Sequence, residues 1–566
     1  MKAILTSFAA FVASVLLTTT SLAASGALDS TFDTDGIATA TAGLGAYGNA
    51  IAIQDDGKIV IAGQYFNSTN FDIIVARFND DGTPDTSFDG DGIVTTTIGS
   101  HEDNATGVAI QSDGKIVVCG YTDNGGEKDF LVLRYETSGT LDSTFSGDGK
   151  VTTNFDGTFA FNEIAQGVAI QSDDKIVVVG ETDVTGGIHP NYDFAIARYN
   201  TDGTLDSSFS GDGKVTTPIG PSHEIANAVV IQPDGNIVAA GESATPTGTR
   251  QFALARYTST GALDTSFSGD GKQTTSINGF IDVINGVAID SGGKIITVGR
   301  SSNGTDDAFG VVRYTPGGSL DTSFSGDGKL TTGGSSSTDG AATGVAIQAS
   351  GKIVVVGAMS GKIVLTRYNW NGSLDTSFGT GGIVSTSLGI GATATAVAIQ
   401  DDGKIVASGQ YYTGSTNLLT AARYTSLQQA DARLGLNVKV KKGNDVYNLT
   451  GASQTQNVTL PAGTRKQIFI GIQNDGPLTD SFAVAGTAGN SDFKVVYKSG
   501  TTNVTAAIVS GSFNTGSLAP GVIFPLTAKV KALTRVPGKT HTITIGTTSD
   551  TDPTGADAVL IKAKSN

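Results

Sequence analysis

The sequence has few of the residue types that most often carry catalytic or redox chemistry. Its 566 residues include one cysteine, four histidines and one tryptophan. The cysteine, Cys119, has no partner for an intrachain disulfide, so the fold must be held by core burial alone. It lies in the apolar run KIVVCG, which favours a packed core residue over a nucleophile.

Positive charge is also scarce. The chain has 36 Lys+Arg against 53 Asp+Glu, a net charge of −17. This balance argues against nucleic acid as a partner, because nucleic-acid binding needs a basic patch. Gly-x-Ser-x-Gly and His-Glu-x-x-His motifs are absent, which excludes the common signatures of serine hydrolases and zinc proteases.

Long apolar runs are missing except at the start of the chain. Residues 1–23 have a charged start, an apolar stretch and a small-residue end, as a signal peptide has, with cleavage expected before Ala24. No other run is long enough for a transmembrane span. We therefore expect a secreted, periplasmic or cell-surface protein.

Glycine and β-branched residues are abundant, and they recur in repeats. Three motifs appear seven times each: a turn such as DTSFSGDGK, a pair of runs such as VAIQSDGKIVVCG, and a run ending in Arg plus an aromatic, such as FLVLRY. The turn begins at Asp29, Asp85, Asp142, Asp206, Asp264, Asp321 and Asp375, with steps of 54 to 64 residues. Such a period is typical of stacked or radial repeats.

Each repeat contains four short β-runs, too short and too β-branched for helices. A lone sheet of this size cannot bury both faces, but seven around an axis can. We therefore expect an all-β fold in which residues 24–426 form a seven-bladed β-propeller of four-stranded blades. With VAIQ innermost, the N-terminal run GIATAT at 36–41 would complete the last blade and clasp the ring.

At these motifs the chain resembles the delta-60 repeat family of bacterial exported proteins. LDTSFSGDGK, VAIQSDGKIVVVG and FAIARYN carry the resemblance, which extends over all seven copies. It implies a propeller and says little about activity.

The repeats stop near residue 426. Residues 427–432 are the expected linker, and alternating short runs follow over 433–566. Such strands at this spacing are typical of an immunoglobulin-like β-sandwich. The resemblance to the small sandwich domains of bacterial surface proteins is loose.

The SGDGK stretches could be phosphate cradles, calcium loops or turns. A phosphate loop needs Gly, four residues and Gly-Lys-Ser/Thr, and no Gly-Lys here has that spacing. An EF-hand also fails, because Ser87 and Ile98 stand at its first and twelfth positions. Turns account for the pattern, with an irregular calcium site at 33–36 or 89–92 left open. The repeated arginines are expected to form structural ion pairs with the repeated aspartates.

A ligand site should lie where the copies differ, at the blade ends that carry loops of changing length. The lead-in segments to the first strands hold a recurring carboxylate, giving the candidate ligand-binding residues Glu102, Glu163, Glu224, Asp282 and Asp339. Three histidines, His101, His189 and His223, fall on the same face, and with the carboxylates they could bind a transition metal. A solvated acidic rim is the plainer alternative.

The leading hypothesis is a non-enzymatic exported scaffold whose propeller loops bind a protein or a glycan, with the sandwich as spacer or attachment module. The first alternative is a polysaccharide hydrolase or lyase that uses the acidic rim. The second is a structural surface-layer component. No cofactor is firmly implied, and calcium or a transition metal stays open.

Overall fold

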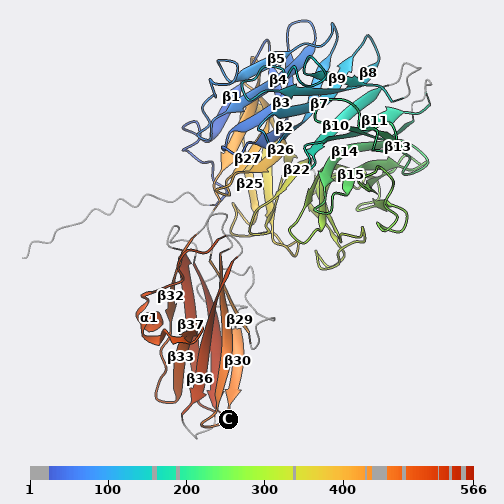
Figure 1. Cartoon of the computed structure of the whole chain (residues 1–566). Coiled ribbons are helices and arrows are strands. Elements are labelled where there is room, and N and C mark those ends of the chain that lie inside the picture. Colours follow the sequence, from blue (N-terminus) through green and yellow to red (C-terminus); the bar gives the residue numbers. More distant parts are fainter. Residues whose placement is uncertain are drawn as a thin grey trace, which may run out of the picture.

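The computed structural model describes residues 25–155, 162–185, 191–335, 339–426, 430–435, 455–474, 480–519, 522–533, 538–549 and 556–565. The expected signal peptide, 1–23, lies outside these residues. The regular secondary structure of the described residues is β-strand, apart from one helix, α1 (Thr505–Ser510). Figure 1 shows the strands of the repeat region, blue through yellow, and those of the C-terminal module, orange to red, as two groups.

Each repeat folds as a four-stranded antiparallel sheet, as the motifs predict. In the second repeat the order is β6 (Asp103–Ile110), β7 (Ile116–Asp123), β8 (Lys128–Tyr135) and β9 (Lys150–Thr153). The QSDGK segment makes the first hairpin, where Asp113 Oδ1 accepts a hydrogen bond from the Lys115 amide at 3.1 Å. The first three strands have seven to ten residues, somewhat longer than expected, and the fourth has four or five.

We number these units 1 to 7 by their first strands, β2, β6, β10, β14, β18, β22 and β26. The remaining strands of the repeat region are β1 (Ile37–Ala40), β2 (Ala46–Ile53), β3 (Ile59–Phe66), β4 (Phe71–Phe78), β5 (Ile93–Thr96), β10 (Glu163–Ile170), β11 (Ile176–Asp183), β12 (Tyr192–Tyr199), β13 (Lys214–Thr217), β14 (Glu224–Ile231), β15 (Ile237–Ala244), β16 (Arg250–Tyr257), β17 (Lys272–Thr275), β18 (Ile281–Ile289), β19 (Ile295–Ser302), β20 (Asp307–Tyr314), β21 (Lys329–Gly333), β22 (Gly340–Ile347), β23 (Ile353–Met359), β24 (Lys362–Tyr368), β25 (Ile383–Thr386), β26 (Ile390–Ile399), β27 (Ile405–Tyr412) and β28 (Asn417–Tyr424).

The first strands are the innermost ones. Each contacts the first strand of the next unit, and β26 contacts β2. A β-bulge in each first strand turns one side chain toward the neighbour. Thr106 Oγ1 thus donates to Ala165 O at 2.8 Å, and Thr395 Oγ1 donates to Gly48 O at 2.7 Å, from the last unit to the first.

The N-terminal run completes the sheet of the last unit, which confirms its expected place as the fourth strand. Strand β1 pairs antiparallel with β28, so that unit has the order β26-β27-β28-β1. The Arg423 Nε, at the end of β28, lies 2.9 Å from Asp29 Oδ2, which precedes β1. Residues almost 400 positions apart are therefore joined by strand pairing and by a buried ion pair.

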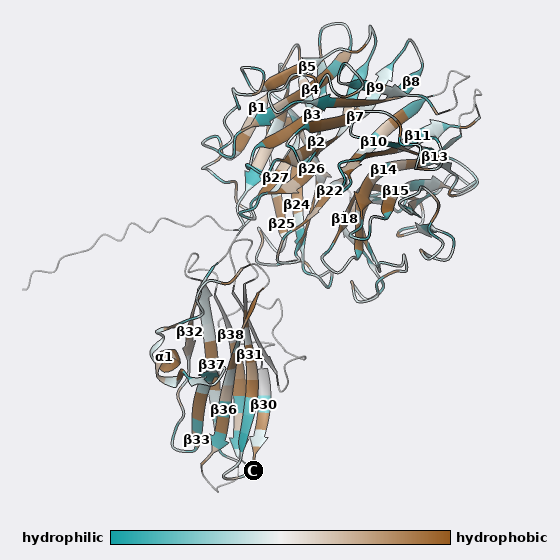
Figure 2. Cartoon of the chain, in the orientation of Figure 1, coloured by the Kyte–Doolittle hydropathy of each residue, from teal (hydrophilic) through white to brown (hydrophobic). Residues whose placement is uncertain are grey.

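The core lies between adjacent units. Ile73 and Val75 of unit 1 pack with Ile116 and Leu131 of unit 2 in one buried cluster. The second and third strands are therefore covered on both faces, which explains their continuous apolar runs. Figure 2 shows these strands in brown.

The C-terminal module consists of two five-stranded sheets, β29-β31-β36-β33-β34 and β30-β38-β37-β32-β35. Their strands are β29 (Ala430–Gly435), β30 (Thr455–Leu460), β31 (Arg465–Asn474), β32 (Phe482–Gly486), β33 (Phe493–Ser499), β34 (Thr502–Asn503), β35 (Phe513–Asn514), β36 (Ile523–Ala532), β37 (Thr540–Ser549) and β38 (Ala556–Ser565).

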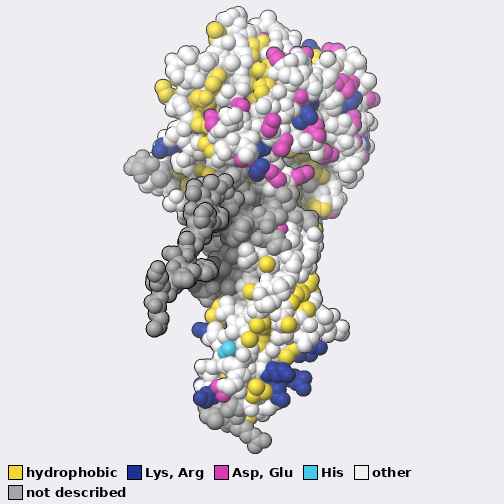
Figure 3. Space-filling model, turned by 90° about the vertical axis from the view of Figure 1, so that its left-hand side faces the viewer, with side chains coloured by type: hydrophobic (Ala, Val, Ile, Leu, Met, Phe, Trp, Pro, Cys, Tyr) yellow, Lys and Arg dark blue, Asp and Glu magenta, His cyan; other side chains and the backbone are white. Residues whose placement is uncertain are grey.

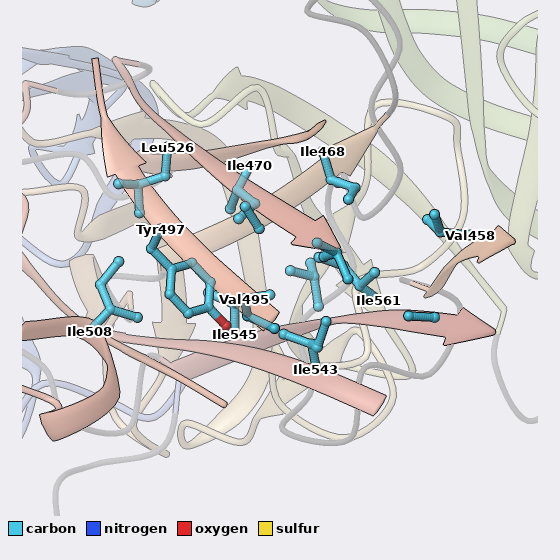
Figure 4. Packing of buried hydrophobic residues seen from close by; sticks show 14 of the residues in the cluster. Val458, Ile468, Ile470, Val495, Tyr497, Ile508, Leu526, Ile543, Ile545 and Ile561 are labelled. Atoms are coloured by element: carbon cyan, nitrogen blue, oxygen red, sulfur yellow. The ribbon is translucent and has the colours of Figure 1, made fainter. Parts of the chain in front are cut away.

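The inner faces of the two sheets share one apolar core. Figure 4 shows Ile470, Leu526 and Tyr497 of one sheet facing Ile543 and Ile561 of the other. Strand β29 begins at Ala430, inside the range expected to be linker. The immunoglobulin-like topology stays a prediction.

Candidate functional site

The two ends of the units differ. At the turn end, one ion pair recurs seven times with nitrogen–oxygen distances of 2.7 to 2.9 Å. The pairs are Arg77–Asp85, Arg134–Asp142, Arg198–Asp206, Arg256–Asp264, Arg313–Asp321, Arg367–Asp375 and Arg423–Asp29. The expected structural ion pair within each repeat is confirmed.

Six of these guanidinium groups also donate a hydrogen bond to the next unit. Arg198 Nε bonds Asp206, and its Nη1 donates to Ser259 O of the next unit at 2.6 Å. The guanidinium carbon lies 4.6 Å from the centre of the Phe209 ring. Because most of its N–H groups have acceptors within the fold, this arginine has a structural role.

The SGDGK stretches are turns. Asp148 Oδ1 accepts a hydrogen bond from the Lys150 amide at 3.1 Å, an Asx turn. Ser146 has φ 51°, and Gly147 and Gly149 have φ 90° and 83°. The positive φ at positions 147 and 149 explains the two glycines, and the turn interpretation is confirmed.

The five predicted carboxylates do not occupy equivalent positions. Glu163, Glu224 and Asp282 lie near the start of a first strand and are fully buried. Glu102 and Asp339 precede their first strands by one residue and are exposed. They do not form one rim, and their ligand-binding role stays a prediction.

Asp103, not Glu102, is the equivalent residue of unit 2. It is fully buried, and Oδ2 accepts from the Ile98 amide at 2.8 Å. Asp282 Oδ2 accepts likewise from the Ile277 amide, at 2.8 Å, and Oδ1 from Ser301 Oγ at 2.6 Å. These buried carboxylates fix the segment that enters each first strand, which is a structural task.

Glu224 is different because it faces a second carboxyl group. It shares a side-chain hydrogen bond with Asp193, which lies near the start of β12 in unit 3. Burial, and then the Asp193 charge, raise the pKa of Glu224 to about 7. Burial also raises the pKa of Asp193. Two buried carboxyls in contact cannot both be ionised, so the pair holds a proton near neutral pH.

A second acid pair lies at the same boundary between units 3 and 4. Glu181 of β11 is 7 % exposed and Glu242 of β15 is 2 % exposed. Burial, and then the Glu242 charge, raise the pKa of Glu181 to about 7. Oε2 of each glutamate has no hydrogen-bond partner among the described residues. Buried polar atoms without partners are rare and mark functional positions.

Half-buried polar and aromatic groups lie close to these acids. Arg250 Nη1 is 2.5 Å from Glu242 Oε1, and the arginine side chain is 40 % exposed. The rings of Tyr192 and His223 stack edge to face with centroids 4.8 Å apart. Burial lowers the pKa of His223, with Arg250 adding to this and Glu242 opposing it. A neutral imidazole can donate or accept a hydrogen bond.

Unit 2 adds a cation beside this cluster. Lys128 Nζ lies 4.0 Å from the centre of the Tyr121 ring, and the Lys128 charge acts on the Glu181 carboxyl. We call Lys128, Glu181, Tyr192, Asp193, His223, Glu224, Glu242 and Arg250 the boundary cluster. It combines acids with raised pKa values, two cations, an aromatic ring and a histidine, the kinds of group that bind a polar ligand.

No metal site emerges at the predicted histidines. His101 Nδ1 lies 3.2 Å from Ser100 Oγ, His223 packs on Tyr192, and His189 lies outside the described residues. In the part of the chain that the structure describes, no group of three or more His, Cys, Asp or Glu side chains could hold a metal. Cys119 is buried, which raises its pKa to about 12.

Sequence reasoning missed most of the boundary cluster, although a signal was there. The residue after the glycine that recurs in every second strand is of five types in the seven units, with Gln and Glu each present twice. It is Gln64, Tyr121, Glu181, Glu242, Arg300, Ala358 or Gln410. A position that changes charge from repeat to repeat, next to one that never changes, points to function better than the lead-in carboxylates do.

Six segments of the chain match the family model described as "Domain of unknown function (DUF5122) beta-propeller". They are residues 54–88, 111–145, 171–209, 232–267, 292–324 and 348–378, each running from a first hairpin to the following turn. The repeats are β-propeller repeats. The search of the curated proteins found no match.

Some solved structures are similar to this chain at low identity and low TM-score. A polysaccharide lyase, Uly1, matches 67 % of this chain and 90 % of its own with 10 % identity and a TM-score of 0.36. Sqt1 of Chaetomium thermophilum matches 68 % and 97 %, with 13 % identity and a TM-score of 0.36. A PL25 ulvan lyase matches 71 % and 96 %, with 12 % identity and a TM-score of 0.37.

Beyond the repeats, the comparisons add nothing about this chain's own ligand. Within its described residues, no helix combines the length and hydropathy needed to span a bilayer.

Proposed function

We propose that this chain is an exported, non-enzymatic binding and scaffold protein of the delta-60 repeat type. Its seven four-stranded units form one seven-bladed propeller, and an immunoglobulin-like module follows. The contact of β26 with β2 and the pairing of β1 with β28 support ring closure. The protein acts in the periplasm or at the cell surface.

The ligand site is the boundary cluster between units 3 and 4. One observation carries this assignment: Glu181 and Glu242 each keep a buried carboxyl oxygen without a hydrogen bond among the described residues. A bound ligand that donates hydrogen bonds would satisfy them. Hydroxyl-rich glycans supply such donors, and the half-buried Tyr192 supplies a face for a sugar ring.

Calorimetric titration of the full mature chain with soluble neutral polysaccharides tests this. We expect a member of a panel of glucans, xylans and galactans to bind, and Glu242→Gln to weaken it at least tenfold. Asp212→Asn, at the turn end of unit 3, is the matched control and should bind as the wild type does. Absence of binding by the whole panel, or equal effects of both variants, would overturn the assignment.

A second candidate function is acid–base catalysis on a polysaccharide at the same cluster. It is favoured by the pKa values of Glu181 and Glu224, both raised to about 7. A carboxyl group with a pKa near the working pH can act as a general acid and then as a base. Screens for reducing-end release and for unsaturated uronate, repeated with Glu181→Gln and Glu224→Gln, would decide. Turnover that both variants lose would favour the enzyme over the scaffold.

A further inference from the structure

The chain's charge is divided unevenly between its two parts. Residues 433–566 contain 14 Lys+Arg and 7 Asp+Glu, a net charge of +7. Residues 1–432 contain the remaining 22 Lys+Arg and 46 Asp+Glu, a net charge of −24. Figure 3 shows Lys and Arg side chains gathered on the C-terminal module, and Asp and Glu side chains spread over the repeat region. Opposite charge on two parts of one chain indicates a partner specific to the smaller part.

The cations of the module have a defined place on the sheet β29-β31-β36-β33-β34. Strand register sets Arg465 of β31 opposite Lys531 of β36, and Lys531 opposite Lys494 of β33. Lys529 lies two residues before Lys531 on β36, and Lys498 lies four residues after Lys494 on β33. Strands lie about 4.8 Å apart, so three cations form a row across roughly 10 Å.

These side chains point away from the core. Along β36 and β33, the buried residues Val530, Ala528, Val495 and Tyr497 alternate with the lysines. Arg465 and Lys494 are exposed. None of the five cations has an ion-pair partner among the described residues. We call Arg465, Lys494, Lys498, Lys529 and Lys531 the basic face.

We propose that the basic face binds a polyanionic glycan, an extended polysaccharide that carries carboxylate or sulfate groups. This proposal is based on charge complementarity, because the five charged side chains of the basic face are all positive. Cations without partners on one sheet face cost repulsion, which anionic groups at similar spacing would relieve. The partner attracts the +7 module and repels the −24 repeat region, so the chain would attach by the module.

A second copy of this chain fits less well. Two copies each carry −17, and their repeat regions repel one another on approach. A linear polymer can lie along the sheet without bringing a second acidic body close. Self-association and attachment to an anionic lipid surface are outcomes that the experiment distinguishes.

The experiment uses the full mature chain and three polymers: polygalacturonate, dextran sulfate and neutral dextran. Surface plasmon resonance should show binding to the first two and none to dextran. The double variant Lys529→Glu with Lys531→Glu should weaken binding at least tenfold. Binding should also fall steeply between low and physiological salt, because the attraction is screened.

A matched double variant tests whether the polymer binds at the basic face or elsewhere on the module. Lys562→Glu with Lys564→Glu makes the same charge change on β38 of the other sheet, where both lysines are exposed. It should lose much less affinity than the β36 variant, and circular dichroism melts should show both variants folded. Equal losses, or no binding to either anionic polymer, would overturn the proposal.

Three further measurements complete the test. Stronger binding to anionic lipid vesicles than to both polymers would assign the face to a membrane and overturn the glycan. Light scattering that shows oligomers abolished by the β36 variant would assign it to a second copy. Neutral-polysaccharide binding at the boundary cluster should be unchanged by the β36 variant, so this proposal and the proposed function fail separately.

Discussion

The two ends of the repeat units obey different rules. At the turn end, an Arg–Asp ion pair recurs in all seven units; six are made through the arginine Nε, whereas Arg256 of unit 4 bonds Asp264 through Nη2. At the loop end, the residue after the second-strand glycine varies among the seven units. Units 3 and 4 both have glutamate there, and each glutamate leaves a buried carboxyl oxygen without a hydrogen bond among the described residues. The repeated residues thus join adjacent units at the turn end, and we look for function among the residues of the loop end, where the units vary.

The energetics of the two ends differ in the same direction. Burial alone would raise the pKa of Asp206, but hydrogen bonds from Ser208 and Lys175 and the Arg198 charge lower it far below its usual range. The same effects act on Asp142 and Asp321. At Glu181, burial and the Glu242 charge outweigh the Lys128 and Arg250 charges, and the pKa is raised. The first arrangement stabilises the fold, and the second destabilises it at neutral pH.

The largest effect should come from deleting residues 24–42. The deletion removes β1 from the last unit and leaves the buried Arg423 without Asp29. Breaking a buried pair by removing one partner costs about 3–5 kcal/mol, and the lost strand adds to this. We expect a sharply lower melting temperature for the whole repeat region by calorimetry. An unchanged melt would show that the clasp does not stabilise the ring.

The next largest effect is expected from removing the charge of a buried aspartate, compared with an exposed aspartate of the same turn. Asp206→Asn leaves Arg198 buried and unpaired, and should lower the free energy of unfolding by about 3 kcal/mol. Asp212→Asn changes the exposed Asx residue of the same turn and should cost less than about 0.5 kcal/mol. Urea unfolding of both variants measures the difference. Similar losses would mean that the ion pair is not what stabilises the turn end.

The pH dependence should have opposite signs at the two ends. Asp206 has a folded pKa below its unfolded value, so its stabilisation is present above about pH 4 and is lost as the pH falls further. Glu181 has a folded pKa of about 7 against 4.5 unfolded, so its contribution is complete below pH 4.5 and is lost as the pH rises through 7. That loss is on the order of 3 kcal/mol.

Melting curves of the wild type and Glu181→Gln between pH 4.5 and 8 test the second half. The variant cannot ionise, so it should gain stability relative to the wild type as the pH rises. Glu127→Gln, at an exposed position, is the control and should run parallel to the wild type. A Glu181→Gln curve that also runs parallel would contradict the raised pKa.

The smallest effect concerns a natural exception at the turn end. Five of the seven units place a lysine of the first hairpin near the paired aspartate, as Lys175 lies 2.9 Å from Asp206. Unit 4 has Asn236 there, 3.4 Å from Asp264. Asn236→Lys should therefore stabilise the chain by about 0.2–1 kcal/mol at low salt. Guanidinium would mask so small a charge effect, so urea is the denaturant, and a loss of stability would contradict the prediction.

Most of the fold was predictable from sequence because the same motifs recur in seven repeats. The four strands of each repeat, the hairpin at QSDGK, the Arg–Asp pair and the N-terminal strand of the last unit all follow from motif order and strand alternation. The strand at Ala430 did not, since its pairing with β31 depends on contacts distant in sequence.

The site was predictable only in part, for a geometric reason. Glu224 and His223 were expected on the loop face, and the structure places both in the boundary cluster. The sequence pattern indicates Glu102, whereas the equivalent residue in the structure is Asp103. The two differ by one position, and a shift of one residue in a strand moves a side chain from the core to solvent. Glu181 and Glu242 lie on different units, and nothing along one strand reveals that they face each other.

The most direct test of the account is polysaccharide binding measured on one pair of variants. We propose that the ligand binds at the boundary cluster and that the turn end has a structural role only. Titration calorimetry should therefore show binding to a neutral polysaccharide that Glu242→Gln weakens at least tenfold and Asp212→Asn leaves unchanged. Binding that Asp212→Asn abolishes and Glu242→Gln spares would place function at the repeated turns and contradict the account.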